Sequence, residues 1–240
     1  ATAFGDNLSP AQKQRLGTRA ILVVHKGQVI AERYADGFTE QTPQLGWSMT
    51  KSVASLLVGR LVAQGKVALT DDHLRPEWTD GRSAITVDNL LRMTSGLAWD
   101  ETYDLGTPIT QMLYREPDMA AYVAAQPLAH PVGTYDQYSS GSTTLLCSVL
   151  NDRAKEGPNL PRTQLFAPLG LTSAVLEPDA TGNPVCSSYL WATPTDWATL
   201  GQFALDDGVV NGQHLLPEGW MKLTTTAKAV RHTEDPGYAA

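Results

Sequence analysis

The sequence of 240 residues is poor in cysteine, in charge and in long apolar segments, and each shortage excludes a class of protein. Two cysteines cannot build the multi-disulfide framework of a small secreted scaffold. No apolar run approaches the roughly 18 to 20 residues of a membrane-spanning helix, so we expect no membrane span. Lys and Arg number 18 against 25 Asp and Glu, a negative excess that argues against binding nucleic-acid backbones. We therefore expect a soluble protein, cytoplasmic or exported.

Several common functional motifs are also absent. The five histidines show no H-x-x-x-H or H-E-x-x-H spacing, so we expect no metal site. No serine has glycine at both minus two and plus two, which excludes a nucleophile elbow. No glycine-rich phosphate loop is present, and we expect no cofactor. The 42% of hydrophobic residues is enough for one large domain or two interleaved ones.

The pattern along the chain predicts many helices but only one clear β-hairpin. The hairpin spans residues 20–34, with Gly27 at its turn. A largely buried helix is expected over residues 47–64 because its apolar residues follow a 3.6-residue period. Shorter helices are expected over residues 87–93, 109–114, 119–125, 141–150, 196–205 and 217–224. Since a two-stranded ribbon is not stable alone in water, the hairpin's further strands must come from elsewhere.

Ser48 and Lys51 are the first candidate catalytic pair. Residues three apart on a helix share a face, so the serine hydroxyl and the lysine amine can meet. A serine becomes a nucleophile when a base takes its proton, and a lysine with a pKa lowered by burial can be that base. The plainer interpretation is a serine N-cap followed by a solvated lysine. The apolar helix that follows favours the catalytic interpretation, because it predicts partial burial of Lys51.

Tyr138 is the second candidate. It lies in a loop that follows a Pro-Val-Gly turn and precedes an apolar helix. A tyrosine there could move protons between Ser48 and a leaving group if Lys51 lay close enough to lower its pKa. By itself, an ordinary loop tyrosine is the simpler interpretation. Cys147 is predicted to be a buried thiol, and the sequence does not decide whether it pairs with Cys186.

Together these motifs resemble the serine β-lactamase-like family. That family includes class C β-lactamases, D,D-peptidases, family VIII esterases and 6-aminohexanoate-dimer hydrolases, the last being the most similar branch. The resemblance covers nearly the whole chain, through the hairpin, Gly46-Trp47-Ser48-Met49-Thr50-Lys51-Ser52, residues 85–97, Tyr138-Ser139-Ser140-Gly141 and residues 216–220.

The resemblance implies a serine hydrolase that cleaves small esters or amides through an acyl-enzyme. Ser48 would be the acylated nucleophile, Lys51 its base and Tyr138 a proton relay, with the Ser48 backbone N–H in the oxyanion hole. Penicillin-directed members carry Asn where Ser140 stands, which points to the esterase and aminohexanoate side. Ser140 and Tyr103 are then the candidate substrate-binding residues.

The resemblance also implies an α+β fold with an antiparallel sheet flanked by helices. Residues 1–65 and 189–240 would form an α/β region, and residues 66–188 a mostly helical region that carries Tyr138. The family's last strands carry a Lys-Thr-Gly or His-x-Gly motif, which no residue after Trp220 matches. We therefore expect an incomplete sheet, with a missing C-terminal segment or a second chain as its partner. The alternatives to an esterase or amidase are a β-lactamase or D,D-peptidase, and a non-catalytic penicillin- or peptidoglycan-binding sensor domain.

Overall fold

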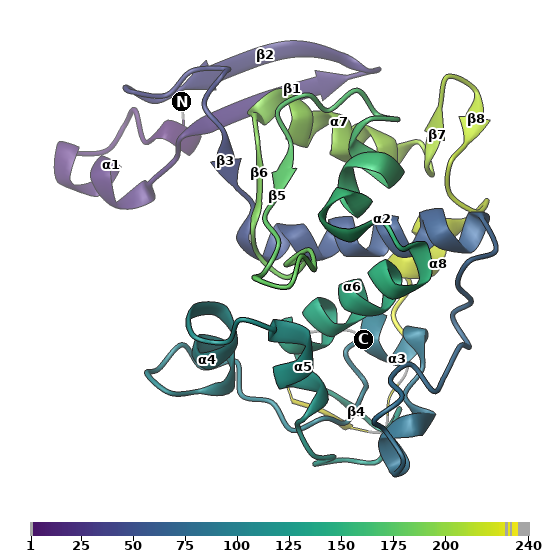
Figure 1. Cartoon of the computed structure of the whole chain (residues 1–240). Coiled ribbons are helices and arrows are strands. Elements are labelled where there is room, and N and C mark those ends of the chain that lie inside the picture. Colours follow the sequence, from purple (N-terminus) through teal and green to yellow (C-terminus); the bar gives the residue numbers. More distant parts are fainter. Residues whose placement is uncertain (1, 229, 231, 235–240) are drawn as a thin grey trace.

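A computed structural model describes residues 2–228, 230 and 232–234 of the chain. Two long helices occupy its centre, a mainly β part lies on one side, and a cluster of short helices lies on the other (Figure 1). This mixture of helices and separate small sheets confirms the predicted α+β class. The α-helices are α1 (Pro10–Leu16), α2 (Thr50–Ala63), α3 (Val87–Leu91), α4 (Pro108–Tyr114), α5 (Met119–Ala124), α6 (Ser140–Ala154), α7 (Pro194–Leu205) and α8 (Trp220–Thr225).

The strands are short except for the N-terminal hairpin. They are β1 (Ala20–His25), β2 (Gln28–Tyr34), β3 (Gln44–Leu45), β4 (Tyr135–Asp136), β5 (Val175–Leu176), β6 (Leu190–Ala192), β7 (Val209–Val210), β8 (Gln213–His214) and β9 (His232–Thr233). Single 3-10 turns stand at η1 (Thr2–Phe4), η2 (Trp47–Met49), η3 (Gly81–Ala84) and η4 (Gly157–Asn159), and a π turn at η5 (Arg162–Phe166).

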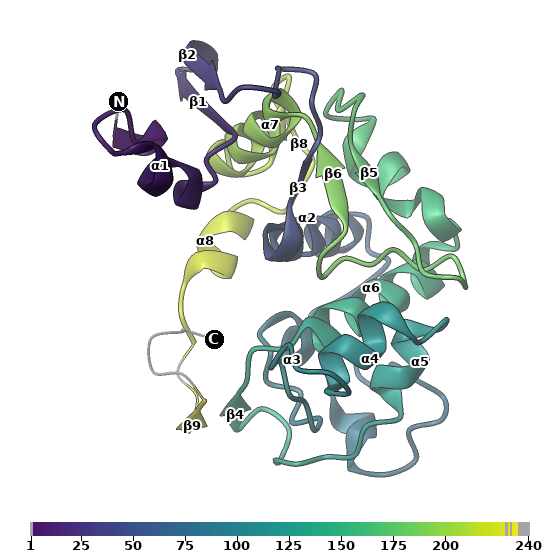
Figure 2. The same ribbon diagram turned by 90° about the vertical axis from the view of Figure 1, so that its left-hand side faces the viewer.

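The predicted hairpin is confirmed. β1 and β2 pair antiparallel, with Ala20 opposite Tyr34. Lys26 and Gly27 both have positive φ, as a two-residue type I′ turn requires. Among the described residues β1 pairs with β2 alone, and helix α7 packs beneath it (Figure 2).

A second sheet has the order β3-β6-β5, with both pairings antiparallel. β5 falls within the range 66–188 that we expected to be mostly helical, yet it pairs with β6 of the other region. The division of the chain into regions 1–65 with 189–240, and 66–188, stays a prediction.

Helices α2 and α6 cross in the middle of the molecule, and both contribute buried side chains to the core. The first eleven residues of α6, 140–150, are all buried, so this helix is apolar or tightly packed on every side. Its first turn is capped by Ser139, whose hydroxyl accepts a hydrogen bond from the Ser142 N–H at 2.9 Å. The α2 side chains Val53, Leu57 and Leu61 are likewise buried. The two helices therefore hold the residues at their N-terminal ends in fixed positions.

Two helices begin three residues later than predicted. Ser48 lies in the 3-10 turn η2, and α2 itself begins at Thr50. Pro217 was predicted at the start of the last helix, but α8 begins at Trp220. The reason is Asp207, whose carboxylate accepts hydrogen bonds from the backbone N–H groups of Gly219 and Met221. A side chain from outside the helix thus caps it, which local sequence does not reveal.

Cys147 is buried as predicted, but it is part of a disulfide and not a thiol, and the pairing that the sequence left open is present. Cys147 and Cys186 form a disulfide across 39 residues of sequence, and both are fully buried. The apolar surroundings that predicted a buried thiol suit a buried disulfide equally well. The bond ties α6 to the segment before β6.

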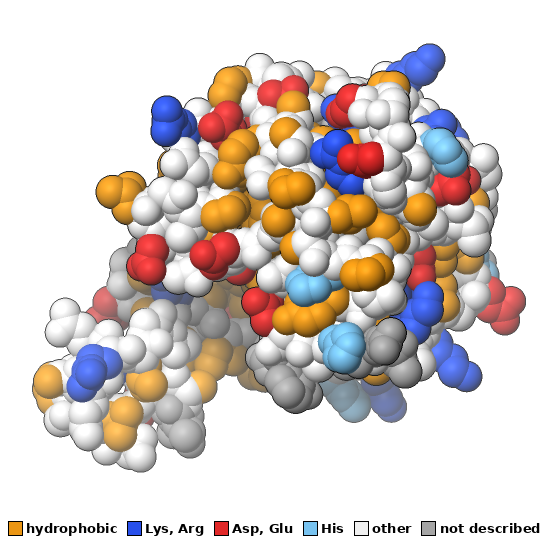
Figure 3. Space-filling view, turned by 90° about the horizontal axis from the view of Figure 1, so that it is seen from below, with side chains coloured by type: hydrophobic (Ala, Val, Ile, Leu, Met, Phe, Trp, Pro, Cys, Tyr) orange, Lys and Arg blue, Asp and Glu red, His pale blue; other side chains and the backbone are white. Residues whose placement is uncertain are grey.

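The surface carries mixed charge. On the face drawn in Figure 3, basic, acidic and hydrophobic side chains are interspersed. None of the helices within the described ranges has the length and apolar character needed to cross a bilayer.

Candidate active site

Ser48 stands at the junction between a strained turn and a rigid helix. The preceding residue, Trp47, has a φ of 44°, which is unusual for a residue with a side chain. Its indole packs edge-to-face against Tyr189, with 6.2 Å between ring centroids. Strain of this kind persists only where surrounding contacts enforce it, and it is often found at functional sites. Here it presents the exposed Ser48 at the end of α2.

The Lys51 amine lies beside Ser48 and makes three hydrogen bonds. Its Nζ is 3.1 Å from Ser48 Oγ, 2.9 Å from Ser140 Oγ and 3.0 Å from the Ser187 carbonyl oxygen. Burial lowers the pKa of Lys51 to about 8, and the negative charge of Glu101 opposes this shift. With this pKa the amine is neutral in roughly a tenth of the molecules at pH 7 and in about half of them at pH 8, and a base must be neutral to take a proton.

Tyr138 joins the same group of side chains from the other side. It follows β4 and precedes α6, and Lys51 Nζ lies 4.9 Å from the centroid of its ring. An ammonium at this distance from an aromatic face is attracted to it. The three residues that the sequence singled out, far apart in the chain, therefore converge.

A cavity of about 540 Å³ opens beside Ser48. Its lining comes from η2 and α2, from the loop after α2, from α3 and the turn after it, from β4 and the residues after it, and from α8. The lining residues are Ser48, Met49, Lys51, Ser52, Ser55, Leu69, Asp88, Leu91, Arg92, Met93, Asp136, Tyr138, Leu223 and Thr224. The volume is in the range of small-molecule sites.

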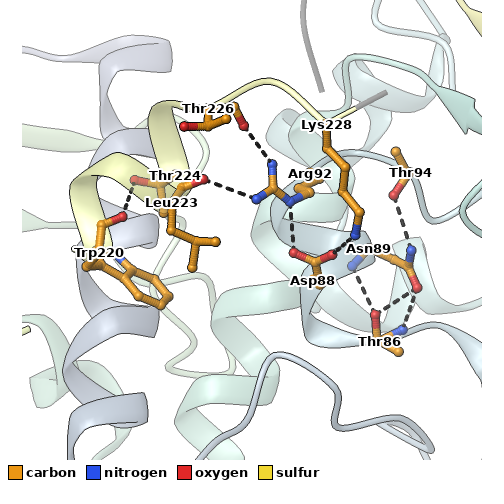
Figure 4. A network of polar contacts seen from close by, with 10 residues as sticks. All are labelled: Thr86, Asp88, Asn89, Arg92, Thr94, Trp220, Leu223, Thr224, Thr226 and Lys228. Atoms are coloured by element: carbon orange, nitrogen blue, oxygen red, sulfur yellow. Dashed lines mark hydrogen bonds and ion pairs between the residues drawn. The ribbon is translucent and has the colours of Figure 1, made fainter. Parts of the chain in front are cut away.

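The wall of this cavity opposite α2 is fixed by an ionic network (Figure 4). The Arg92 guanidinium donates to the carbonyl oxygens of Leu223 and Thr226 at the C-terminal end of α8. It also pairs with Asp88 at 2.9 Å, and Asp88 in turn pairs with Lys228 at 2.7 Å. A cation at a helix C-terminus is favourable, so the network holds α8 against α3.

Ser140 does not face the solvent. It is fully buried at the first position of α6, between Lys51 and Glu101. Its predicted contact with substrate stays a prediction, and its contacts favour a positioning role. Tyr103 is 54% exposed in the loop before α4, and desolvation followed by the charge of Glu101 raises its pKa. Tyr103 is not among the residues that line the cavity, so its predicted role is also untested.

Glu101 is a site residue that sequence reasoning missed. Its carboxylate accepts hydrogen bonds from the Trp99 indole and from both the backbone N–H and the hydroxyl of Ser140. The only available signal was its place two residues before Tyr103, which was a candidate substrate-binding residue. A loop glutamate is usually solvated, and only its contact with residue 140 distinguishes this one.

The disulfide and α6 together place the Ser187 carbonyl that contacts Lys51. Cys186 is bonded to Cys147 of α6, and Ser187 receives a hydrogen bond from Thr144 of the same helix at 3.1 Å. Gly141 completes the packing, since a Cβ there would stand 2.6 Å from the Trp99 ring. Within the described part of the chain, no three His, Cys, Asp or Glu side chains gather as metal ligands would.

Comparisons with known proteins identify a matching family model and similar chains. A family model described as beta-lactamase matches residues 5–239. The chain is 26% identical to a 6-aminohexanoate-dimer hydrolase of Paenarthrobacter ureafaciens, in an alignment that covers 96% of the chain and 64% of that relative.

Solved structures share the fold. One, from Bacillus anthracis and described as a 6-aminohexanoate-dimer hydrolase, has a TM-score of 0.73 and 22% identity, covering 85% of this chain and 58% of that one. A D-stereospecific amidohydrolase from Streptomyces has a TM-score of 0.64 and 17% identity, covering 87% and 71%. The chain thus spans less than two thirds of the length of the Paenarthrobacter hydrolase and of the Bacillus structure. The expected partner of the sheet, a further segment or a second chain, stays a prediction.

Proposed function

Since the chain belongs to the beta-lactamase family, we propose that it is a serine hydrolase that cleaves small carboxylic esters or linear amides through an acyl-enzyme on Ser48. One observation carries the proposal: a lysine amine with a pKa lowered to about 8 lies 3.1 Å from the Ser48 hydroxyl. That is the arrangement of a nucleophile and its base.

The reaction follows from these contacts. Ser48 Oγ attacks the carbonyl carbon of the substrate while its proton passes to Lys51 Nζ. The bond to the leaving oxygen or nitrogen breaks, and that atom receives a proton through Tyr138, whose ring adjoins Lys51. Water then attacks the acyl carbon, and Ser48 regains its proton as the acid leaves.

Two observations favour esters and linear amides over β-lactams. Residue 140 is a serine and offers no side-chain amide to a penicillin. Its hydroxyl is also buried and already bonded to Glu101 and Lys51. The named relatives include a 6-aminohexanoate-dimer hydrolase and an amidohydrolase.

The assignment of Ser48 is tested with a fluorophosphonate probe and intact mass spectrometry. We expect one adduct on Ser48 in the wild type and none in Ser48→Ala, because only an activated serine displaces fluoride from phosphorus. Ser83→Ala, a serine in η3 that donates to the Asp80 carbonyl, is the matched control and should label like the wild type. A folded wild type without an adduct, or an adduct that survives Ser48→Ala, would reject the proposal.

The substrate class is tested on the same wild-type protein. A p-nitrophenyl ester, the linear 6-aminohexanoate dimer and a chromogenic cephalosporin are each supplied in excess. Turnover of the ester or the linear amide supports the proposal. A single stoichiometric burst without turnover would indicate a sensor domain, and preferential cleavage of the cephalosporin a β-lactamase.

A further inference from the structure

The carboxylate of Glu101 is surrounded by hydrogen-bond donors. The Trp99 indole N–H and the Ser140 backbone N–H both donate to Oε2, the latter at 2.9 Å, and the Ser140 hydroxyl donates to Oε1. An ionised carboxylate can only accept, so the direction of each bond is fixed. The single proton of the Ser140 hydroxyl is therefore committed to Glu101.

This commitment decides how Ser140 meets Lys51. With its proton turned to Glu101, Ser140 Oγ can only accept from Lys51 Nζ, at 2.9 Å. The Ser187 carbonyl oxygen, 3.0 Å from the same Nζ, is also only an acceptor. A neutral amine has two protons and one lone pair, and these two acceptors take both protons. The lone pair is left for the third partner, the Ser48 hydroxyl at 3.1 Å.

We propose that Glu101 is a positioning residue, which acts through the Ser140 hydroxyl to aim the lone pair of neutral Lys51 at the proton of Ser48. The inference rests on the proposed function. It goes beyond that function by giving a role to a residue that touches neither the nucleophile nor its base. Glu101 thereby fixes which group donates in the hydrogen bond between Lys51 and Ser140, a bond that adjoins the reacting groups without including them.

Glu101→Gln reverses that polarity without changing the shape of the side chain. The two N–H groups at Oε2 require the amide oxygen there, so the amide nitrogen must face Ser140 Oγ. Ser140 then accepts from the amide, and its own proton has two acceptors left, the Tyr103 hydroxyl and the Lys51 amine. The amine is the more basic of the two, so the proton turns to the lone pair of Lys51. The base is occupied by the wrong donor. In Ser140→Ala there is no hydroxyl proton to compete with the Ser48 proton for the lone pair of Lys51. The only loss is the acceptor for one of the two Lys51 protons.

The experiment measures the rate at which the fluorophosphonate probe acylates Ser48 at about pH 9.5, well above the pKa of Lys51, so that changes in that pKa contribute little. We expect Glu101→Gln to be slower than the wild type by roughly 100-fold, at the lower end of the range for general-base catalysis, and Ser140→Ala by only about tenfold. The double variant should recover to the rate of Ser140→Ala, because the reversed hydroxyl is gone.

A merely structural role for Glu101 predicts a different order. The double variant would then be as slow as Glu101→Gln or slower, and that result would overturn the proposal, as would a Glu101→Gln rate equal to that of the wild type. Folding of each variant is judged by its thermal unfolding midpoint. If Glu101→Gln alone does not fold, the labelling rates of Ser140→Ala and of the double variant are compared, and the proposal requires these two rates to be equal. Glu177→Gln is the matched control, because Glu177 also accepts an indole N–H, from Trp191, yet has no contact with Lys51.

The experiment distinguishes a failure of the proposed role of Glu101 from a failure of the hydrolase assignment. If the wild type gains no adduct on Ser48, the hydrolase assignment itself fails. If the wild type is acylated and the double variant shows no recovery, the hydrolase assignment stands and only the role of Glu101 is lost.

Discussion

Replacing Lys51 with methionine is expected to slow acylation of Ser48 by 10²- to 10⁴-fold, the range that a general base contributes. Methionine keeps the approximate length of the side chain and its packing in the buried site, but its thioether is not basic and cannot take the serine proton. The measurement is the rate of fluorophosphonate labelling, together with initial rates of ester hydrolysis. The loss should be in kcat, since the amine acts in the transition state.

Lys66→Met is the matched control for this variant. Lys66 is an exposed lysine that pairs loosely with Glu156, at 3.7 Å, and it should leave the labelling rate unchanged. Retention of a near-normal rate in folded Lys51→Met would assign the base to another group, with Tyr138 the next to test.

Reduction of the Cys147–Cys186 disulfide is expected to lower the free energy of unfolding by about 4 kcal/mol, from the closure entropy of a 39-residue loop. Because α6 and the segment around Ser187 both supply hydrogen-bond acceptors to Lys51, reduction should also weaken the positioning of the Lys51 amine. The measurement is equilibrium unfolding in urea, with and without a thiol reductant.

The double variant Cys147→Ala/Cys186→Ala serves as the control for this prediction. Its unfolding midpoint should not respond to the reductant and should lie well below that of the oxidised wild type. An oxidised wild type with the same midpoint as the fully reduced protein would contradict a stabilising role for the bond.

Patterns local in sequence predicted much of what positions the site. The hairpin followed from β-branched runs around Gly27, and both its strands and its turn are confirmed. The spacing of Ser48 and Lys51 predicted their contact, and the structure places Tyr138 beside them. The hairpin and the Ser48–Lys51 contact depend on backbone periodicity or on a motif within a few residues, which is what a single sequence displays. The place of Tyr138 was implied by the family resemblance and not by a local pattern.

The remaining features depend on contacts between distant segments. Glu101 meets Ser140 across 39 residues of sequence, and a carboxylate in a loop gives no sign of such a partner. Asp207, which lies outside α8, caps the start of that helix. Cys186 comes within bonding distance of Cys147 through the packing of α6 against the segment before β6. Ser140 was assigned to the substrate because it stands where penicillin-directed members carry Asn, and its contacts with Glu101 and Lys51 join segments far apart in the chain. Tertiary packing, rather than propensity, decided all four.

The most direct test of the central claim, that neutral Lys51 activates Ser48, is the pH dependence of acylation. Below its pKa of about 8, Lys51 is protonated and cannot accept the serine proton, and above that pH it can. The rate of fluorophosphonate labelling of the wild type, measured between about pH 6 and about pH 10, should rise along a single-proton curve with its midpoint near 8. A rate that does not change over this range, or one that is highest at the acidic end, would contradict the claim.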